Sequence, residues 1–235
     1  MLETMPPELV GVAVALYGSK RVQHLEAELK RHGLEEMVHI YRSHRDTTDG
    51  VRGCFKGHQA AIRTALMLKP QAKWVLVVED DVTFERRGDR SVTTALWEAC
   101  SALDTGKTNV VGLGGYCVAP MGAEVVDSVR RSRWNCAHCY VLSAAGAREV
   151  LSWEYRRASN TYGMGAHYDQ VMSARLTQSI LLPTIAFQRA HYGDEDITTT
   201  ATGSYFYTVA QFVRNIINPR TPQIFLEYLF YMMRK

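Results

Sequence analysis

The chain has 235 residues, of which 46% are hydrophobic and 22% are charged, and its formal net charge is +3. A chain of this length fits one large domain or two small ones, and its composition excludes a fibrous or a mainly disordered protein. The basic excess is too small to indicate a nucleic-acid-binding protein by itself.

Short apolar runs alternate with amphipathic segments along most of the chain. We expect strands at 10–16, 37–41, 74–78, 109–113, 139–142 and 180–187. Helices are expected at 22–33, 57–68, 91–103 and 144–157, with a further helix running through Val171 and Leu176. The strand runs are too apolar for a sheet with one solvated face, so they indicate strands that are buried on both faces. This pattern predicts one α/β domain with a mostly parallel central sheet flanked by helices.

The cellular compartment is inferred from the cysteines and from the first residues. Five cysteines are too sparse, and odd in number, for a secreted scaffold that is held together by disulfides. The opening residues MLETMPPELV are not basic and carry no long apolar run, unlike a signal peptide. The sequence also shows no apolar run long enough for a membrane-spanning helix. These features predict a cytoplasmic protein.

The strand expected at 74–78 leads directly into three carboxylates, Glu79, Asp80 and Asp81. Ligands of parallel sheets bind beyond the carboxyl ends of the strands, which is where these residues are expected. Burying adjacent carboxylates is costly without a cation, and their hard oxygen atoms suit Mn²⁺ or Mg²⁺. In an extended segment Glu79 and Asp81 would share one face while Asp80 points away. The alternative is that the three residues only end the strand and open a turn.

Residues 53–58, Gly-Cys-Phe-Lys-Gly-His, together with the later Glu-Asp-Asp strand end, resemble glycosyltransferase family 25. This family comprises the lipooligosaccharide galactosyltransferases and the collagen galactosyltransferase domains. Further segments are similar to family segments in the same order; these are 137–143 with Gly146 and Ala147, Tyr168-Asp169, and 183–188. Two departures are Gly57, where the family usually has serine, and 15–21, which replaces an Asn-Leu followed by an arginine pair.

The resemblance implies a GT-A-like (Rossmann-like) domain over residues 1–203 that uses a nucleotide-sugar donor, here a UDP-sugar, and a divalent metal ion. It implies transfer of a hexose to an acceptor hydroxyl, with inversion at the anomeric carbon. Asp81 is then expected to bind Mn²⁺ or Mg²⁺, and Glu79 or Asp80 to contact the donor or to act through water. His191, after the last expected strand, is a second expected metal ligand; the alternative is a surface loop histidine.

Leu16, Gly18 and His58 are expected to line the donor site. Gly18 precedes a helix whose N-terminus favours phosphate, and His58 has a structural role as its alternative. Inverting transfer needs a carboxylate that removes the proton of the acceptor hydroxyl. Asp169, at the start of a helix, is the expected catalytic base. Its alternative role is that of a helix N-terminal carboxylate, which the helix dipole favours.

The acceptor is expected to be a saccharide or a protein hydroxyl, and DNA with a hydroxymethylated base stays open because basic residues cluster locally, as at 130–133. Residues 204–235 are expected to form a C-terminal helical extension. Its aromatic and basic end fits packing on the domain, a homodimer contact or a membrane surface. Two other functions stay open: a metal-dependent nucleotidyl or phosphoryl transferase, and a non-catalytic module that binds nucleotide sugars or carbohydrates.

Overall fold

The computed structural model describes residues 4–86, 90–117, 121–156 and 167–188. Contacts divide the chain into two units, Met1–Ala190 and His191–Lys235. The expected metal ligand His191 and the expected extension at 204–235 lie outside the described residues.

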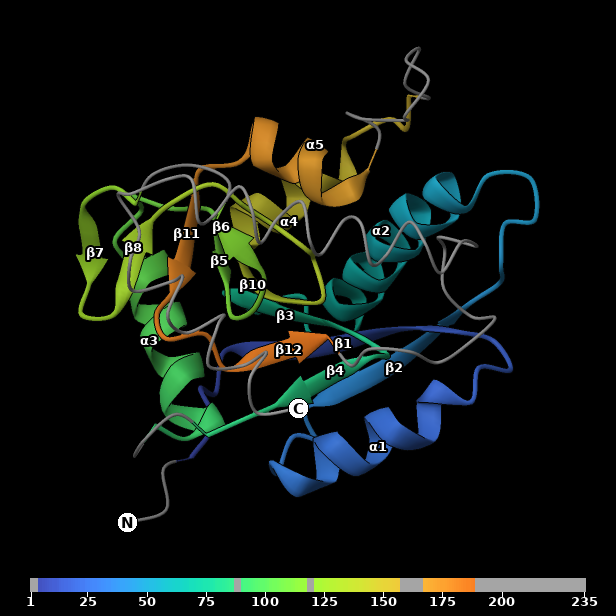
Figure 1. Ribbon diagram of the computed structural model, residues 1–235, viewed down its shortest axis with the longest axis horizontal. Coiled ribbons are helices and arrows are strands. Elements are labelled where there is room, and N and C mark those ends of the chain that lie inside the picture. The colour runs from blue at the N-terminus through green and yellow to red at the C-terminus, as the bar shows by residue number, and fades with distance from the viewer. Residues whose placement is uncertain (1–3, 87–89, 118–120, 157–166, 189–235) are drawn as a thin grey trace, which may run out of the picture. The chain divides into compact units, whose positions relative to one another are not determined.

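Within the described residues, an eight-stranded sheet has the order β2-β1-β3-β10-β5-β11-β8-β7 (Figure 1). The strands are β1 (Leu9–Leu16), β2 (Val38–Ser43), β3 (Trp74–Glu79), β5 (Val110–Gly112), β7 (Glu124–Val126), β8 (Val129–Arg131), β10 (Cys139–Ser143) and β11 (Gln178–Leu181). β1 is parallel to β2 and β3, and β5 is parallel to β11, whereas β10 and β8 are antiparallel to their neighbours. All strands except β10 and β8 therefore point one way. The predicted α/β fold with a mostly parallel central sheet is confirmed.

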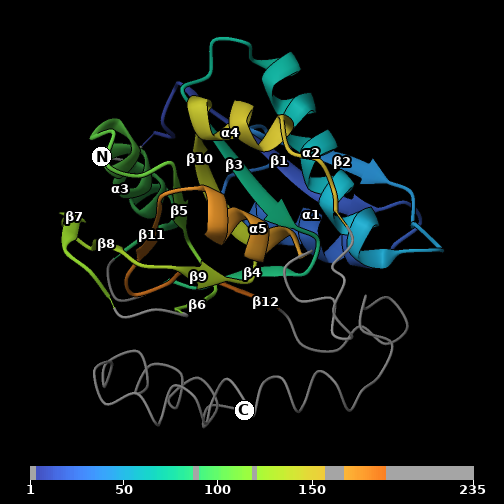
Figure 2. The ribbon, with the colours of Figure 1, turned by 90° about the horizontal axis from the view of Figure 1, so that it is seen from above.

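Helices cover both faces of this sheet (Figures 1 and 2). They are α1 (Arg21–Arg31), α2 (Gly50–Leu68), α3 (Val92–Asp104), α4 (Ala144–Leu151) and α5 (Tyr168–Arg175). Leu76 and Val78 of β3 pack in one core with α1 and α3, while Val75 and Val77 pack in a second core with α2, α4 and α5. Alternate side chains of β3 thus face different helix layers, and this explains why its sequence is apolar throughout. None of the described helices combines the length and the apolar character that a membrane crossing needs.

Three element boundaries differ from the sequence-based expectations. α2 begins at Gly50 rather than near residue 57, because the Asp49 side chain accepts the backbone N–H of Arg52 and caps the helix. α4 ends at Leu151, before the expected end at 157. The apolar run at 180–187 forms two strands rather than one, because the chain leaves the large sheet after β11. Its second part pairs with another strand, and periodicity does not show such a change of partner.

Within the described residues, four short strands lie outside the main sheet. They are β4 (Val82–Phe84), β6 (Tyr116–Cys117), β9 (Trp134–Asn135) and β12 (Ala186–Gln188). β12 pairs antiparallel with β4, and β6 pairs antiparallel with β9. Strands of this length carry too few residues for an alternating pattern to be recognised.

Two glycines on and just after β5 make room for close packing. A Cβ atom at Gly112 would lie 2.7 Å from the indole of Trp134, a side chain that is fully buried. A Cβ atom at Gly114 would collide with the His138 ring and with the carbonyl oxygen of Ala186. Gly114 forms a bridge with Ala186, the first residue of β12, so the missing side chain allows β12 to approach the end of β5.

Candidate functional site

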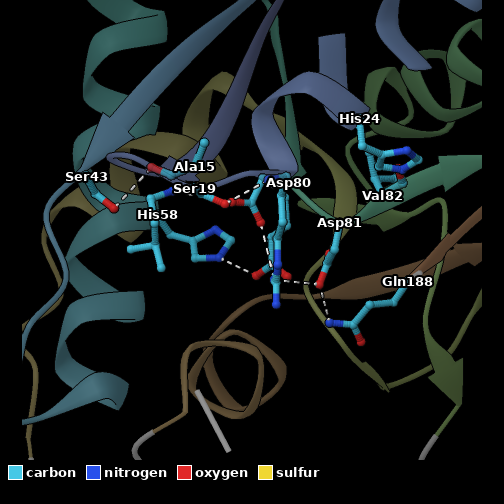
Figure 3. A network of polar contacts seen from close by, with 12 residues as sticks. Ala15, Ser19, His24, Ser43, His58, Asp80, Asp81, Val82 and Gln188 are labelled. Atoms are coloured by element: carbon cyan, nitrogen blue, oxygen red, sulfur yellow. Dashed lines mark hydrogen bonds and ion pairs between the residues drawn. The ribbon is translucent and has the colours of Figure 1, made fainter. Parts of the chain in front are cut away.

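Glu79, Asp80 and Asp81, which we call the acidic corner, lie at the carboxyl end of β3 (Figure 3). Glu79 is the last residue of β3, and β4 begins at Val82 after a turn. The backbone N–H of Leu16, the last residue of the neighbouring parallel strand β1, donates to Asp80 Oδ2 at 3.3 Å. Asp80 and Asp81 are both buried. The corner therefore lies at the sheet edge where ligands of parallel α/β sheets bind.

Arg21, the first residue of α1, holds the two aspartates together. Its Nη1 atom lies 3.5 Å from Asp80 Oδ1 and 3.3 Å from Asp81 Oδ2. The expectation that Glu79 and Asp81 share a face is therefore wrong: β3 ends at Glu79, and the turn brings Asp80 and Asp81 to the same guanidinium. Gln188 of β12 adds a hydrogen bond from its Nε2 to Asp81 Oδ2 at 2.8 Å (Figure 3).

The second oxygen of Asp81 has no such partner. Asp81 Oδ1 is buried and accepts no hydrogen bond from any residue that the structure describes. Burial, and after it the charge of Glu79, raises the pKa of Asp81 to about 7, against the opposing effects of the Gln188 hydrogen bond and the Arg21 charge. Burial also raises the pKa of Asp80, against the opposing charge of Arg21. A buried carboxylate oxygen without a donor fits a divalent cation with hard oxygen ligands, such as Mn²⁺ or Mg²⁺.

Glu79 faces the other way, toward α2. Its Oε1 atom lies 2.9 Å from Nε2 of His58, whose Nδ1 lies 2.9 Å from the hydroxyl of Tyr140. Tyr140 donates in turn to the Tyr168 hydroxyl at 3.0 Å, and the His58 ring stacks on the Tyr168 ring at a centroid distance of 4.2 Å. Burial acts to raise the pKa of Glu79, but the hydrogen bond and charge of His58, together with the charges of His138 and Arg21, lower it overall. The structure thus places the expected donor-site residue His58 against the acidic corner.

An aromatic pair stands at the carboxyl ends of β1 and β2. Tyr17 is 69% exposed and stacks on His44, with ring centroids 5.4 Å apart and planes at 28°. The next residue, Gly18, has a φ of 76° in the turn that leads to α1. Sequence reasoning pointed to Gly18 but missed Tyr17 and His44, because single aromatic residues outside an apolar run carry no periodic signal. Together they form a flat, exposed surface near the acidic corner.

Asp169, the expected base, lies in the first turn of α5. Its Oδ2 atom accepts the backbone N–H of Cys136 at 2.9 Å, and its Oδ1 atom accepts that of Gln170 at 2.8 Å. Cys136 has a φ of 72°, an unusual value for a residue with a side chain. The carboxylate therefore supports a strained turn and the start of a helix. A carboxylate can accept about four hydrogen bonds, and the described backbone groups use two of them at Asp169. The others can serve the hydroxyl group that receives the sugar.

No family model matches the chain, and no curated protein matches it. Several solved structures are similar in fold. A197 from STIV is 14% identical, with 77% of this chain and 86% of that chain covered and a TM-score of 0.48. A glycosyltransferase involved in the glycosylation of the major capsid of PBCV-1 is 13% identical, with coverage of 69% and 73% and a TM-score of 0.44. A mutant Drosophila β-1,4-galactosyltransferase 7, in complex with manganese, UDP-Gal and xylobiose, is 10% identical, with coverage of 84% and 79% and a TM-score of 0.39. Sequence identities and TM-scores this low do not show what this chain does, so its function is inferred from the geometry of the site.

Proposed function

We propose that the protein is a metal-dependent glycosyltransferase that moves a hexose from a UDP-sugar to a hydroxyl group of a saccharide or a protein. The observation that carries this proposal is the buried Oδ1 atom of Asp81, which accepts no hydrogen bond from the described residues and lies at the carboxyl end of β3. A divalent cation bound there would neutralise the charge that develops on the departing diphosphate. The resemblance to family 25 in residues 53–58 and in the acidic motif supports the same assignment.

The residues around the acidic corner fit the other parts of a nucleotide sugar. The exposed Tyr17–His44 pair offers a face on which a nucleobase stacks. The Gly18 turn leads into the N-terminus of α1, where the positive end of the helix dipole favours the phosphate groups of a nucleotide sugar. Asp80 is held at the end of β1 by Arg21 and by the backbone of Leu16. Since Tyr17 directly follows Leu16, a ribose attached to a base stacked on Tyr17 would lie near Asp80.

The first test measures nucleotide release from a panel of UDP- and GDP-sugars with Mn²⁺. We expect UDP release from one UDP-sugar, its loss on chelation, and a fall in kcat on the order of 100-fold or more for Asp81→Asn. Asp127→Asn, the same change at an exposed turn, is the matched control. Release of pyrophosphate instead of UDP would indicate a nucleotidyl transferase. A thermal shift by UDP-sugars without any turnover would indicate a binding module, and either result overturns the proposal.

Asp169 is proposed as the base that accepts the proton of the acceptor hydroxyl. Asp169→Asn keeps an oxygen that can accept the Cys136 N–H, so the turn and α5 should persist. We expect kcat to fall by roughly 100-fold or more while the dissociation constant of the donor is unchanged. An equal loss of donor binding would instead assign Asp169 the structural role alone.

A further inference from the structure

A second group of metal-binding atoms lies beside the acidic corner, on the α2 side. Cys54 and His58 are four residues apart on α2, and therefore on the same face of the helix. Glu79 of β3 faces them. One ligand atom from each of these three residues, a sulfur, a ring nitrogen and a carboxylate oxygen, lies within 4.8 Å of the other two.

The surroundings of His58 fix its ring in the orientation that a metal ligand needs. Because the Tyr140 hydroxyl donates to Tyr168, its oxygen is available to accept the Nδ1–H of His58. The parallel stacking on Tyr168 prevents the ring from turning away. A metal-bound histidine usually donates its other ring N–H to such a partner, which fixes the tautomer. Nε2, which lies 2.9 Å from Glu79 Oε1, is then the nitrogen that can bind a cation, because the cation would replace the proton of this hydrogen bond.

The electrostatic field at Cys54 favours a positive ion. The carboxylates of Glu79, Asp169 and Asp81 all act on the Cys54 thiol through their negative charge. Their negative potential attracts a cation, which would compensate the charge of a bound thiolate.

We propose that Cys54, His58 and Glu79 bind Zn²⁺, in a site separate from the Asp81 oxygen. A thiolate, an imidazole and a carboxylate form a donor set typical of zinc, whereas Mn²⁺ and Mg²⁺ prefer oxygen atoms alone. Three protein ligands leave a fourth coordination position open, as in zinc sites that bind a water or a substrate atom. The Glu79 side chain is 25% exposed, which provides an entry path from solvent. This proposal does not depend on the proposed glycosyl transfer.

The test titrates chelator-treated full-length protein with Co²⁺ and records the absorption of the cobalt–thiolate bond. We expect one equivalent of Co²⁺ to produce this band and Zn²⁺ to abolish it. Cys54→Ser should remove the band, and His58→Gln should weaken Co²⁺ binding by about 100-fold or more. Cys100→Ser, a change at a buried cysteine of α3, is the matched control and should keep the band. Tyr140→Phe should weaken binding about tenfold through loss of the His58 hydrogen bond.

Absence of the thiolate band in the wild-type protein would overturn the proposal without the need for any variant. Persistence of the band in folded Cys54→Ser protein, checked by its cooperative thermal unfolding, would overturn it as well. Asp81→Asn separates the two proposals, since it should abolish Mn²⁺-dependent turnover and retain the cobalt band. The zinc proposal can thus be refuted while the transferase proposal is supported, and the transferase proposal can be refuted while the zinc proposal is supported.

Discussion

Two clusters in this protein pair aspartate with arginine, and they differ in nearly every other respect. Near the start of α2, Arg52 of this helix donates to Asp46 of the preceding loop through Nε at 2.6 Å and Nη2 at 3.0 Å. The backbone N–H groups of Thr48 and Asp49 donate to the same carboxylate. At the acidic corner, a single nitrogen atom of Arg21 serves two carboxylates at longer distances.

The charge states of the two clusters follow from these contacts. The Arg52 hydrogen bond holds the pKa of Asp46 far below its usual value. Burial has the opposite effect at Asp81, where the pKa is raised to about 7. A neighbouring arginine therefore does not by itself decide whether an aspartate is ionised; the number of donors and the access of water decide it. At Asp46 both carboxylate oxygens accept hydrogen bonds that hold the loop before α2. At the acidic corner, Asp81 Oδ1 accepts none from the described residues.

The largest effect is expected when the acidic corner loses its arginine. Arg21→Met should lower the free energy of unfolding by about 3 kcal/mol at pH 8, because two buried carboxylates are left without a cation. At pH 5 the loss should be smaller, since Asp81, with a pKa of about 7, is then mostly protonated and uncharged. Urea unfolding at both pH values measures the difference, with Arg21→Lys as the control that keeps the positive charge. An equal loss at both pH values would contradict this account.

A smaller effect of opposite sign is expected at Asp81. Its folded-state pKa of about 7 exceeds the value of about 3.9 in unfolded chains, so the folded state binds more protons between these pH values. The contribution of Asp81 to stability is therefore fully present below about pH 4 and is lost as the pH rises through 7. Without metal, Asp81→Asn should be more stable than the wild type by about 2 kcal/mol at pH 8, with a difference that shrinks toward pH 4.

Mn²⁺ provides the control for this measurement. Added at pH 8, it should raise the melting temperature of the wild type by mass action and leave Asp81→Asn unchanged. If Mn²⁺ stabilises both proteins equally, the ion binds elsewhere.

The smallest effect is expected at the Asp46–Arg52 cluster. Asp46→Asn should lower the melting temperature by only about 2 °C, because solvent screens this partly exposed pair, and should leave nucleotide release unchanged. Its pH dependence has the sign opposite to that of Asp81. The folded-state pKa of Asp46 is lowered, so its contribution is present above the unfolded value and is lost as the pH falls. Comparison of the two variants by thermal unfolding between pH 3 and pH 8 tests this contrast.

Much of the fold could be predicted from local patterns. The run at 74–78 is apolar at every position because both faces of β3 are covered, and such runs predicted the main strands. The antiparallel direction of β10 between β3 and β5 could not be predicted, because an apolar run looks the same in either direction. The early start of α2 depends on the cap at Asp49, within a loop that looked irregular.

The place of the acidic corner in the fold was predicted, but the contacts that its side chains make were not. The position of Glu79, Asp80 and Asp81 at a strand end indicated a cation site, and the structure places them at that edge of the sheet. The contacts of Arg21 and Gln188 with Asp81 join segments that are far apart in the chain, so no local pattern reveals them. The roles of all the expected site residues stay predictions; these are Leu16, Gly18, His58, Glu79, Asp80, Asp81, Asp169 and His191, the last of which lies outside the described residues.

The absence of a side chain at Gly114 matters for any mutagenesis that aims to change the metal or donor preference of this protein. A side chain at position 114 would collide with Ala186 and push β12 outward. Gln188 lies two residues after Ala186 in the same strand. A change at residue 114 would thus disturb the hydrogen bond from Gln188 to Asp81, although residue 114 does not belong to the acidic corner. Library designs aimed at the choice of metal or donor should therefore hold residue 114 constant, so that gains at the acidic corner are not masked by a displaced strand.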